Sequence, residues 1–528
     1  MTVTDSGVYI GLDLGTSGLK GVALAASGEV IASGSAAYPT HRPALGAAEQ
    51  APQDWIAAAE AVAGQLGGQV PSRLWRGIGL SAMIPTLVTV AADGDPTGPA
   101  ITWQDSRADG QGDTLRELYG GDALYQATGQ WVDGRYLLPM FLRVAREEPS
   151  RAAATARLIA AKDYLFGWLT GGIATDPSTA SGFGCYRLEP GAWDAGVIAA
   201  AAGLLPGAGR RPDGPPLSSL VPPSRRAAFP SLPAVLPSLT LRPLRDQAAA
   251  RLGCGPIPVC LGAADSVLGA VGLGVREPGQ VAYIAGTSNV IIGLAGRAVT
   301  DPAHRYLVTP LAEPGRWGLE MDVLATGSAI RWLAGLTGDG GADGDSQAGG
   351  DAGEAAVVAL AARLDPRDAP LVLPYLSPGE QGALWDPLLH GTFVGVQLGH
   401  GRQHLARGLV NGIVLESRRC LAVLDEVGDF GREVRVAGGS AADPGFRADL
   451  ADATRHRVSM PAGTDCSARG AALLAAKAVT GDWPPPAGAG PVAKPEPGRA
   501  RQWDTLWSDY EHAREAIARH YHRHGTSA

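Results

Sequence analysis

The sequence predicts an α/β protein built from two large lobes, and three observations carry this prediction. The chain has 528 residues, which is more than one domain at roughly 100–200 residues per domain. Strand-like and helix-like segments alternate through much of its length, which favours α/β architecture. A strand–turn–strand unit with Gly-Thr-Ser at its tip occurs twice, around Thr16 and around Thr287, and this recurrence indicates an internal duplication.

The composition excludes several other classes of protein. The net charge of −8 argues against broad nucleic-acid binding. Five cysteines without a CxxC pair are not typical of a disulfide framework or a zinc site, and they fit a reducing cytosol. The N-terminus lacks the features of a signal peptide, and the chain has no run of about 20 apolar residues. We therefore expect a cytoplasmic protein without a membrane or nucleic-acid partner.

The first strand–turn–strand unit has the features of a phosphate site. Val8–Leu14 is typical of a buried strand and Leu19–Leu24 of its partner, and small residues form the turn between them: Gly15, Thr16, Ser17 and Gly18. Backbone N–H groups of small residues can approach a phosphate closely. Asp13 at the strand end can hold Mg²⁺ directly or through water. A plain β-hairpin is the alternative. No P-loop string and no GxGxxG string is present, so neither of those nucleotide sites is supported.

Two further glycine-rich turns follow later in the chain. The unit from Gln280 to Gly293 repeats the first pattern, with Gly286, Thr287 and Ser288 at its tip. The pair of tips favours the phosphate interpretation over two unrelated hairpins. A strand that ends in Gly438, Gly439 and Ser440 before a helix lets a flat ring or a ribose lie against the backbone. An ordinary turn between a strand and a helix is the alternative there.

Asp265 is the candidate catalytic carboxylate. A short strand, Pro258–Leu261, meets Gly262, and Asp265 then opens a helix of small residues. A carboxylate at a helix N-terminus is stabilised as an anion, and it can accept a proton from a hydroxyl that attacks a phosphate. The alternative is that Asp265 only caps the helix. The surrounding glycines and alanines allow a ligand to come close, which favours the catalytic interpretation.

These clusters, in this order, resemble the FGGY carbohydrate kinases from about Tyr9 to Ala476. Seven segments carry the resemblance: YIGLDLGTSGLKGVAL, ITWQDSRA, AKDYLFGWLTGGIATDPSTASG, GAADSVLGAVG, AYIAGTSN, LPYLSPGEQGALWDP and VAGGSAADPGFRADLADATRHRV. Among the members of the family, the chain is most similar to xylulokinases and next to gluconate kinases. The resemblance implies the duplicated actin-like (ribonuclease H-like) ATPase fold with a central cleft. It divides the chain into an N-terminal lobe at 1–255 and a C-terminal lobe at 256–482. The remaining residues, 483–528, are expected to form a linker and a final helix, because Pro484–Arg499 is rich in Pro and Gly and Trp503–His524 has helix periodicity.

The resemblance also implies where ATP and Mg²⁺ bind. The phosphates would rest on the two tips, Gly15–Ser17 and Gly286–Ser288, with Asp13 near the metal ion. The adenosine would lie near Gly438–Ser440. The sugar would lie on the first lobe, and Asp265 would face the hydroxyl that receives the phosphate.

The sugar site implied by the resemblance consists of Met83, Trp103 and Asp105. For Trp103 and Asp105, packing and capping at a strand end are the alternative. The chain departs from the family pattern here, because Ser81-Ala82-Met83-Ile84-Pro85 stands where xylulokinases carry Gln-Met-His. An Ile–Pro pair cannot supply the hydrogen bonds of the missing side chains. Asn289 also stands where the second phosphate motif usually has glycine.

The resulting hypothesis is an ATP-dependent kinase of a pentulose such as D-xylulose. A gluconate or polyol kinase of the same family is the first alternative. A non-catalytic sugar sensor or a chaperone-like ATPase is the alternative from another class. The expected partners are the sugar and ATP, and a homodimer is left open.

Overall fold

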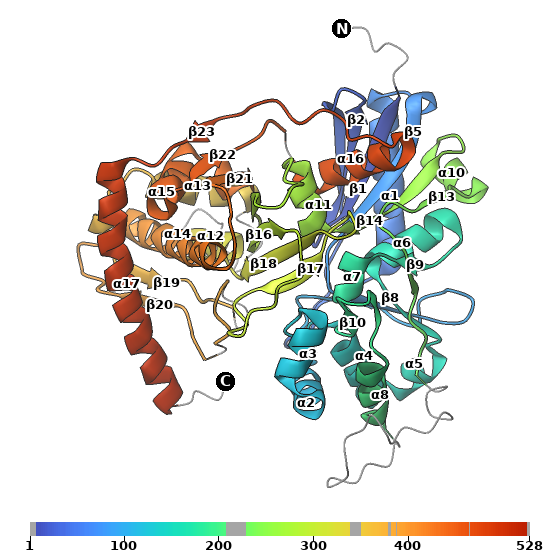
Figure 1. Ribbon diagram of the computed structural model, residues 1–528, viewed down its shortest axis with the longest axis horizontal. Helices are drawn as coiled ribbons and strands as arrows, with labels where there is room; N and C mark the ends of the chain where they lie inside the picture. The colour runs from blue at the N-terminus through green and yellow to red at the C-terminus, as the bar shows by residue number, and fades with distance from the viewer. Residues whose placement is uncertain are drawn as a thin grey trace.

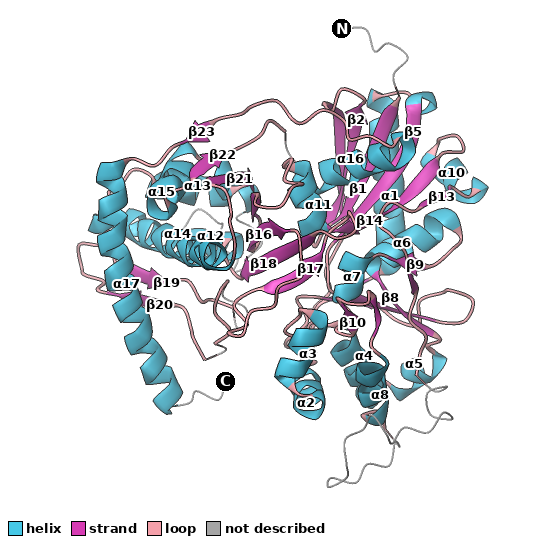
Figure 2. Cartoon of the chain, in the orientation of Figure 1, coloured by secondary structure: helices cyan, strands magenta, loops and turns pink. Residues whose placement is uncertain are grey.

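The computed structural model describes residues 7–206, 229–337, 350–377, 382–386, 388–463 and 465–524. Within these residues the chain forms two lobes, each built around a large sheet (Figure 1). Helices flank both sheets, as the colouring by secondary structure shows (Figure 2). The predicted α/β class with two lobes is confirmed.

The first lobe is organised by a six-stranded sheet with the order β13-β14-β5-β1-β2-β3. Its strands are β1 (Val8–Leu14), β2 (Gly18–Ala25), β3 (Val30–Ala37), β5 (Trp75–Ala82), β13 (Leu241–Pro243) and β14 (Pro258–Ala264). Strand β1 is almost fully buried because helices cover both faces of the sheet, and such strands are apolar without alternation.

A smaller four-stranded sheet with the order β4-β7-β6-β8 lies beside the six-stranded one. Its strands are β4 (Glu49–Gln50), β6 (Thr86–Val90), β7 (Ala100–Thr102) and β8 (Arg157–Ala160). Short pairs are formed by β9 (Ala174–Thr175) with β12 (Ala234–Val235), and by β10 (Tyr186–Arg187) with β11 (Ala192–Trp193). The helices up to the end of this lobe are α1 (Pro52–Gln69), α2 (Asp109–Tyr119), α3 (Gly121–Thr128), α4 (Leu137–Glu147), α5 (Pro149–Ala154), α6 (Ala161–Thr170), α7 (Pro177–Ser181), α8 (Ala195–Gly203), α10 (Asp246–Leu252) and α11 (Asp265–Gly272).

The second lobe is organised by a seven-stranded sheet with the order β17-β18-β16-β15-β21-β22-β23. Its strands are β15 (Val281–Ala285), β16 (Asn289–Ala295), β17 (Leu307–Pro310), β18 (Trp317–Val323), β21 (Glu433–Gly438), β22 (Arg457–Ser459) and β23 (Val492–Ala493). A separate pair joins β19 (Leu371–Leu373) to β20 (Thr392–Val394). The remaining helices are α12 (Gly327–Leu336), α13 (Gly350–Ala361), α14 (Arg402–Val427), α15 (Pro444–Thr454), α16 (Cys466–Thr480) and α17 (Pro497–His524).

The internal duplication is visible in the strand pairing. The hairpin β1–β2 has Leu14 opposite Leu19, and the hairpin β15–β16 has Ala285 opposite Asn289. The first strand of each hairpin also pairs in parallel with a later strand, β1 with β5 and β15 with β21. Both Gly-Thr-Ser tips therefore lie at the same position of their sheets, as the repeated sequence pattern predicts.

Two segments assigned to the C-terminal lobe by sequence are joined to the first sheet. Strand β14 pairs in parallel with β5, and helix α16 packs against β1 and β5. Glycines make the helix contact possible, because a Cβ on Gly11 would lie 1.9 Å from the Ala468 carbonyl oxygen and one on Gly79 would lie 2.0 Å from that of Ala471. The boundaries at 255 and 482 stay predictions, whereas these contacts show that the chain crosses between the lobes more than once.

The C-terminal helix α17 begins at Pro497 and lies along the second lobe (Figure 1). Its side chains Trp503, Leu506 and Tyr510 are buried in the core of that lobe, so the predicted final helix is confirmed. In the described part of the chain, the five cysteines form no disulfide. None of the described helices combines the length and the apolar character that a membrane span requires.

Candidate active site

The carboxyl ends of three parallel strands meet at one edge of the first sheet. Ala82 at the end of β5 pairs with Leu14 of β1 on one side and with Ala264 of β14 on the other. The first Gly-Thr-Ser turn follows Leu14 and Asp265 follows Ala264, so both lie at this edge. In open α/β sheets, ligands bind outside the carboxyl ends of the strands.

The second sheet presents an equivalent edge. Strands β15 and β21 are parallel, with Ala285 beside Gly438, so the turn Gly286–Ser288 and the turn Gly438–Ser440 are neighbours. The Gly439 N–H donates to the Ala285 carbonyl at 3.1 Å. Gly438 has φ +106°, and a Cβ there would lie 1.9 Å from the Ala285 oxygen. Glycine is therefore required at this position by both backbone conformation and space.

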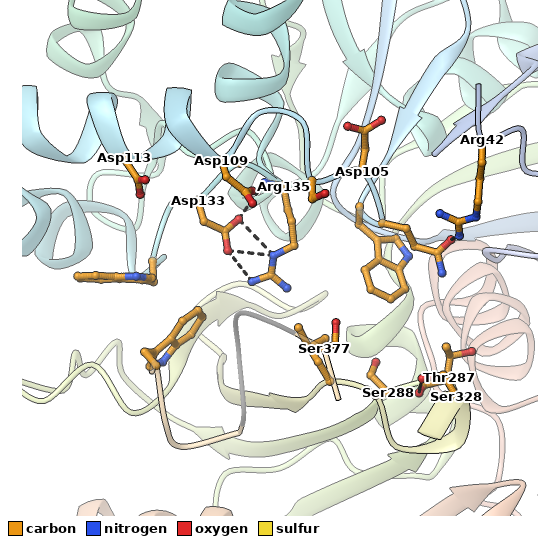
Figure 3. Close-up of a pocket in the computed structure, with 18 of the residues that line it drawn as sticks. Arg42, Asp105, Asp109, Asp113, Asp133, Arg135, Thr287, Ser288, Ser328 and Ser377 are labelled. Atoms are coloured by element: carbon orange, nitrogen blue, oxygen red, sulfur yellow. Dashed lines mark hydrogen bonds and ion pairs between the residues drawn. The ribbon is translucent and has the colours of Figure 1, made fainter. Parts of the chain in front are cut away.

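Two connected cavities lie between these edges. The smaller, of about 220 Å³, is lined by Asp265 together with Thr16 of the first turn and Gly286–Ser288 of the second. The larger, of about 530 Å³, opens beside it (Figure 3). The two share five lining residues: Trp103, Arg135, Thr287, Ser288 and Leu324. One cavity is thus lined by part of the residues selected from the sequence, Thr16, Trp103, Asp265 and Gly286–Ser288. Gly438–Ser440 line neither cavity.

Asp265 is the first residue of α11 and faces the smaller cavity. The N-cap position is Ala264. Among the described residues, the Asp265 carboxylate accepts only a local bond, to Oδ1 from the Ser266 N–H at 2.9 Å. Burial raises the pKa of Asp265 well above its usual range, and the negative charge of Asp13 raises it further. The position of Asp265 in a cavity favours the catalytic interpretation over simple capping.

The strand before Asp265 is longer than predicted, because Gly262 does not end it. Strand β14 continues to Ala264, and its pairing with β5 shifts between Cys260 and Ala263. Gly262 has φ +79°, and a Cβ there would lie 1.7 Å from the Leu80 carbonyl oxygen. Gly262 therefore forms a bulge rather than a turn, and such bulges re-aim the residues that follow.

Three charged residues of the smaller cavity were not found by sequence reasoning: Arg135, Glu320 and Asp322. The Glu320 Oε2 accepts from the Thr309 hydroxyl at 2.6 Å, and burial raises the pKa of Glu320. Burial, reinforced by the charge of Glu320, raises the pKa of Asp322 to about 8. A signal was present, because the two acids stand two positions apart in the apolar strand WGLEMDV and so share one face.

The first turn is held in place by side chains around it. The Gly15 carbonyl accepts from the Tyr38 hydroxyl at 2.5 Å, and the Trp103 Nε1 donates to the Thr16 hydroxyl at 3.1 Å. Trp103 and Thr16 both line the smaller cavity, whereas Asp13, Gly15 and Ser17 are not among its lining residues. Trp103 is thus placed to contact a ligand, as the resemblance implies.

Asn289, which replaces a glycine of the usual motif, fixes the base of the second turn. Its side chain is fully buried. The Asn289 Nδ2 donates to the Tyr283 hydroxyl at 2.5 Å, and its Oδ1 accepts from the Thr326 hydroxyl at 2.9 Å. The asparagine therefore has a structural role below Ser288, and its side chain does not compete with a phosphate at the tip.

Two of the predicted sugar contacts are not supported by their positions. Met83 is 2% exposed and packs in the core of the first lobe, while the next residues, Ile84 and Pro85, line the smaller cavity. Asp105 borders the larger cavity, but its carboxylate points away from Ser288 and Ser377 (Figure 3). In the segment after β5, Ile84 and Pro85 rather than Met83 therefore face the cavity.

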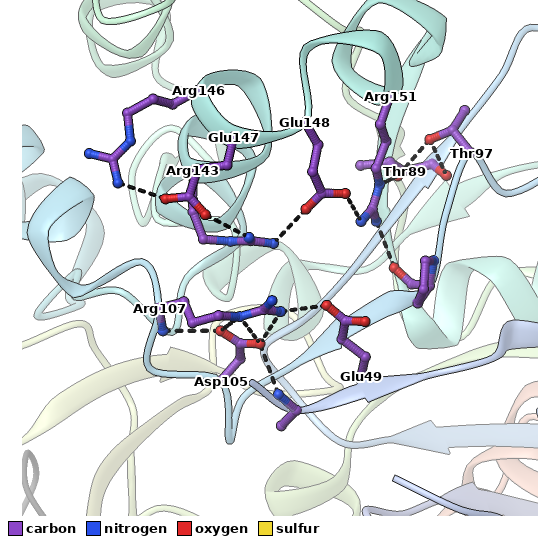
Figure 4. A network of polar contacts seen from close by, with 12 residues as sticks. Glu49, Thr89, Thr97, Asp105, Arg107, Arg143, Arg146, Glu147, Glu148 and Arg151 are labelled. Atoms are coloured by element: carbon purple, nitrogen blue, oxygen red, sulfur yellow. Dashed lines mark hydrogen bonds and ion pairs between the residues drawn. The ribbon is translucent and has the colours of Figure 1, made fainter. Parts of the chain in front are cut away.

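The carboxylate of Asp105 is engaged by its own neighbours. It accepts from the Ala48 N–H at 2.9 Å and from the Arg107 side chain, which also reaches Glu49 at 2.6 Å (Figure 4). These bonds favour the packing and capping interpretation of Asp105.

The acidic residues also fit a magnesium ion that arrives with a phosphate ligand. The described residues contain no group of three or more His, Cys, Asp or Glu side chains that could hold a metal alone. Magnesium is usually bound by one or two carboxylates, several waters and the phosphates of the substrate. Asp13 stands at the strand end beside the first turn and accepts from the Ser81 hydroxyl at 2.6 Å, which suits such a partial site.

Comparisons with known proteins agree with this geometry. The model of the N-terminal domain of the FGGY family of carbohydrate kinases matches residues 8–206, and that of the C-terminal domain matches residues 281–479. The chain belongs to the FGGY family of carbohydrate kinases. It is a sugar kinase by family, and the resemblance seen in its motifs is confirmed.

Similar FGGY kinases include proteins named for different substrates. The chain is 27% identical to a gluconokinase of Bacillus licheniformis over 88% of its own length and 86% of that protein. It is 28% identical to a xylulose kinase of Escherichia coli (strain K12) over 89% of each chain.

Solved structures of the family share the fold over nearly the whole chain. A xylulose kinase from Rhodospirillum rubrum has a TM-score of 0.80 at 28% identity, covering 98% of this chain and 100% of that one. A gluconate kinase from Lactobacillus acidophilus has a TM-score of 0.82 at 22% identity, covering 98% and 99%. The predicted duplicated actin-like ATPase fold is confirmed by these matches.

Proposed function

We propose that this FGGY kinase transfers the γ-phosphate of ATP to a hydroxyl group of a pentulose such as D-xylulose, with Asp265 as the general base. One observation carries the proposal: Asp265 lines the same cavity as Thr16 of the first turn and Gly286–Ser288 of the second. A base must come within hydrogen-bond reach of the hydroxyl that it deprotonates, and this cavity offers that position.

The nucleotide would be held at the edges of both sheets. Thr16 and Gly286–Ser288 would bind the phosphates, Asp13 would hold Mg²⁺, and Gly438–Ser440 would lie against the adenosine. Mg²⁺ with ATP supplies the transferable phosphoryl group and neutralises its charge. Since such transfer depends mostly on positioning and charge neutralisation, one carboxylate is a sufficient base.

The electrostatics of the smaller cavity favour a base with a raised proton affinity. Burial raises the pKa of Asp265, so its carboxylate takes a proton more readily than an exposed one does. A general base is most effective when its pKa lies near the working pH. Closure of the lobes would also exclude water and limit hydrolysis of ATP.

The same cavity offers little to attract the carboxylate of an aldonate, and this favours an uncharged sugar. Its carboxyl groups, Asp265, Glu320 and Asp322, gather where the substrate would lie. The Arg135 Nε, which could attract an acid, donates to the Asp133 carboxylate at 2.9 Å. Gluconate kinase activity remains the alternative because gluconokinases are among the relatives. A sugar-sensing or chaperone-like ATPase is the alternative from another class.

The test is an ADP-release assay with D-xylulose, D-gluconate, erythritol and glycerol. We expect D-xylulose to give a kcat/KM at least about tenfold above that of D-gluconate, since specificity reflects differential transition-state binding. A higher kcat/KM for gluconate or a polyol would show that this compound, and not a pentulose, is the preferred substrate. ATP turnover that is the same with and without every sugar would favour the sensor or chaperone-like alternative.

A further inference from the structure

A buried charged network lies behind the strand that leads to Asp265. The Lys162 Nζ is 3.1 Å from the Asp176 Oδ1 and 3.6 Å from the Asp163 Oδ1, and all three side chains are fully buried. Lys162 and Asp163 stand in the first turn of α6, and Asp176 is the N-cap of α7. The Asp176 Oδ2 also accepts from the Ser178 hydroxyl at 2.6 Å.

The network reaches strand β14 on both sides of the Gly262 bulge. The Lys162 Nζ donates to the Leu261 carbonyl at 3.1 Å. The Ala264 N–H donates to the Ser178 hydroxyl at 2.9 Å. These bonds matter because a bulge removes backbone groups from the sheet ladder, and buried backbone groups need other partners. The residue immediately before Asp265 is thus fixed by a serine hydroxyl from another element.

Ser238 adds a third support. Its carbonyl accepts from the Gly262 N–H at 3.0 Å, and its hydroxyl donates to the Asp176 carboxylate at 3.2 Å. Helix α7, which carries Ser178, ends at Ser181 and is followed by Gly182, and both of these line the smaller cavity. One short helix therefore supports the peptide before Asp265 and part of the cavity wall.

Stability alone does not account for such a network. Burying an ammonium and two carboxylates costs several kcal/mol per ion in desolvation, and apolar replacements are often equally stable. The network does, however, set the path of a strand that no regular ladder holds at Gly262. Its polar groups converge on three nearby backbone positions, 261, 262 and 264, just before Asp265.

We propose that Ser178, with Lys162 and Asp176 behind it, is a positioning residue that holds the Asp265 carboxylate at the cavity. The catalytic meaning of this position rests on the proposed function of Asp265, whereas the support of the backbone does not. Ser178 lines neither cavity, and it acts through the Ala264 peptide.

The test is Ser178→Ala, which removes the acceptor of the Ala264 N–H but keeps the helix cap, since Asp176 caps through the Ser178 backbone N–H. We expect kcat for the best sugar to fall about tenfold or more, because small misplacements of catalytic groups have large effects. The KM for ATP should stay within about twofold, because the nucleotide turns are untouched. Amide hydrogen exchange in a peptide covering 259–268 should accelerate.

Thr89→Val is the matched control. Thr89 is also fully buried, and its hydroxyl likewise serves two partners, the Arg151 Nε at 3.1 Å and the Thr97 hydroxyl at 2.7 Å (Figure 4). It stands in β6, and it does not line either cavity. We expect both Ser178→Ala and Thr89→Val to lower the melting temperature, because each removes a buried hydrogen-bonding hydroxyl. Thr89→Val should leave kcat and exchange at 259–268 unchanged.

The outcomes separate this inference from the proposed function. An active wild type with Ser178→Ala within about twofold in kcat would overturn the positioning role, as would an equal loss in Thr89→Val. A wild type that phosphorylates no sugar would overturn the proposed function instead. In that case hydrogen exchange still tests whether Ser178 holds the backbone before Asp265, and unchanged exchange at 259–268 in Ser178→Ala would overturn that role.

Discussion

Asp265→Asn is expected to lower kcat by roughly 10²-fold or more, because general-base catalysis contributes typically 10²–10⁴-fold. Asparagine has nearly the same shape, and its amide oxygen can accept the Ser266 N–H bond that Asp265 makes now. The KM for ATP should change little. The measurement is steady-state ADP release with the best sugar, together with ATP binding to the variant.

The same substitution is expected to stabilise the fold near neutral pH. Because burial raises the pKa of Asp265 in the folded state, folding favours its protonated form. Its contribution to stability is therefore fully present below the unfolded pKa of about 3.9 and is lost as pH rises through the raised folded pKa. Asparagine carries no charge, so the melting temperature of the variant should exceed that of the wild type at neutral pH, with the difference vanishing in acid.

Asp246→Asn is the matched control for Asp265→Asn. Asp246 is also the first residue of a helix, α10, but it is exposed to solvent. We expect neither kcat nor the melting temperature to change appreciably in this variant. A loss in kcat of less than about threefold in Asp265→Asn would mean that Asp265 only begins the helix and is not the general base. A fall in the melting temperature of that variant would contradict the electrostatic argument.

Gly438→Ala is expected to give the second large effect, on stability and on nucleotide binding together. The new Cβ would lie 1.9 Å from the Ala285 carbonyl oxygen, at a φ of +106° that alanine rarely adopts. Backbone strain of ~1–3 kcal/mol and overpacking of ~1–3 kcal/mol add to a loss of ~2–6 kcal/mol. Relief of the clash must separate the ends of β15 and β21, so the KM for ATP should rise about tenfold or more, with a smaller change in the KM for the sugar.

Gly253→Ala distinguishes the clash from the backbone strain. Gly253 has φ +65°, and no atom from the described part of the chain lies within 4 Å of a Cβ built there. We expect a loss of only about 1 kcal/mol and unchanged kinetics. Denaturant unfolding and ATP titration of both variants check the prediction, and equal effects of the two substitutions would show that the contact with Ala285 is unimportant.

The sequence was most informative where local pattern decides the structure. The two hairpins are set by apolar runs on either side of small-residue turns, and both form as predicted. Asp265 was found because it opens a helix after a strand, which is also a local feature. The Gly262 bulge was not found, because its conformation depends on the backbone of Leu80 in a distant strand.

The direction of side chains at strand ends was also not predictable from the sequence. Sequence alone does not show which of Met83 and Ile84 faces a cavity, since one residue of register reverses the two. Glu320 and Asp322 can be recognised as cavity residues only when the fold brings β18 to the same cavity as Asp265. The packing of α16 on the first sheet likewise depends on Gly11 and Gly79, because a Cβ at either position would clash with the backbone of the helix. This requirement is visible only in the folded structure.

The most direct measurement of the central claim follows the fate of the γ-phosphate. ATP labelled in that group is mixed with the wild-type protein and D-xylulose, and the labelled products are separated. The account predicts that the label appears in a phosphorylated sugar, and that this transfer is slowed by roughly 10²-fold or more in Asp265→Asn. Label that appears only in inorganic phosphate, at a rate independent of sugar and of Asp265, would contradict it.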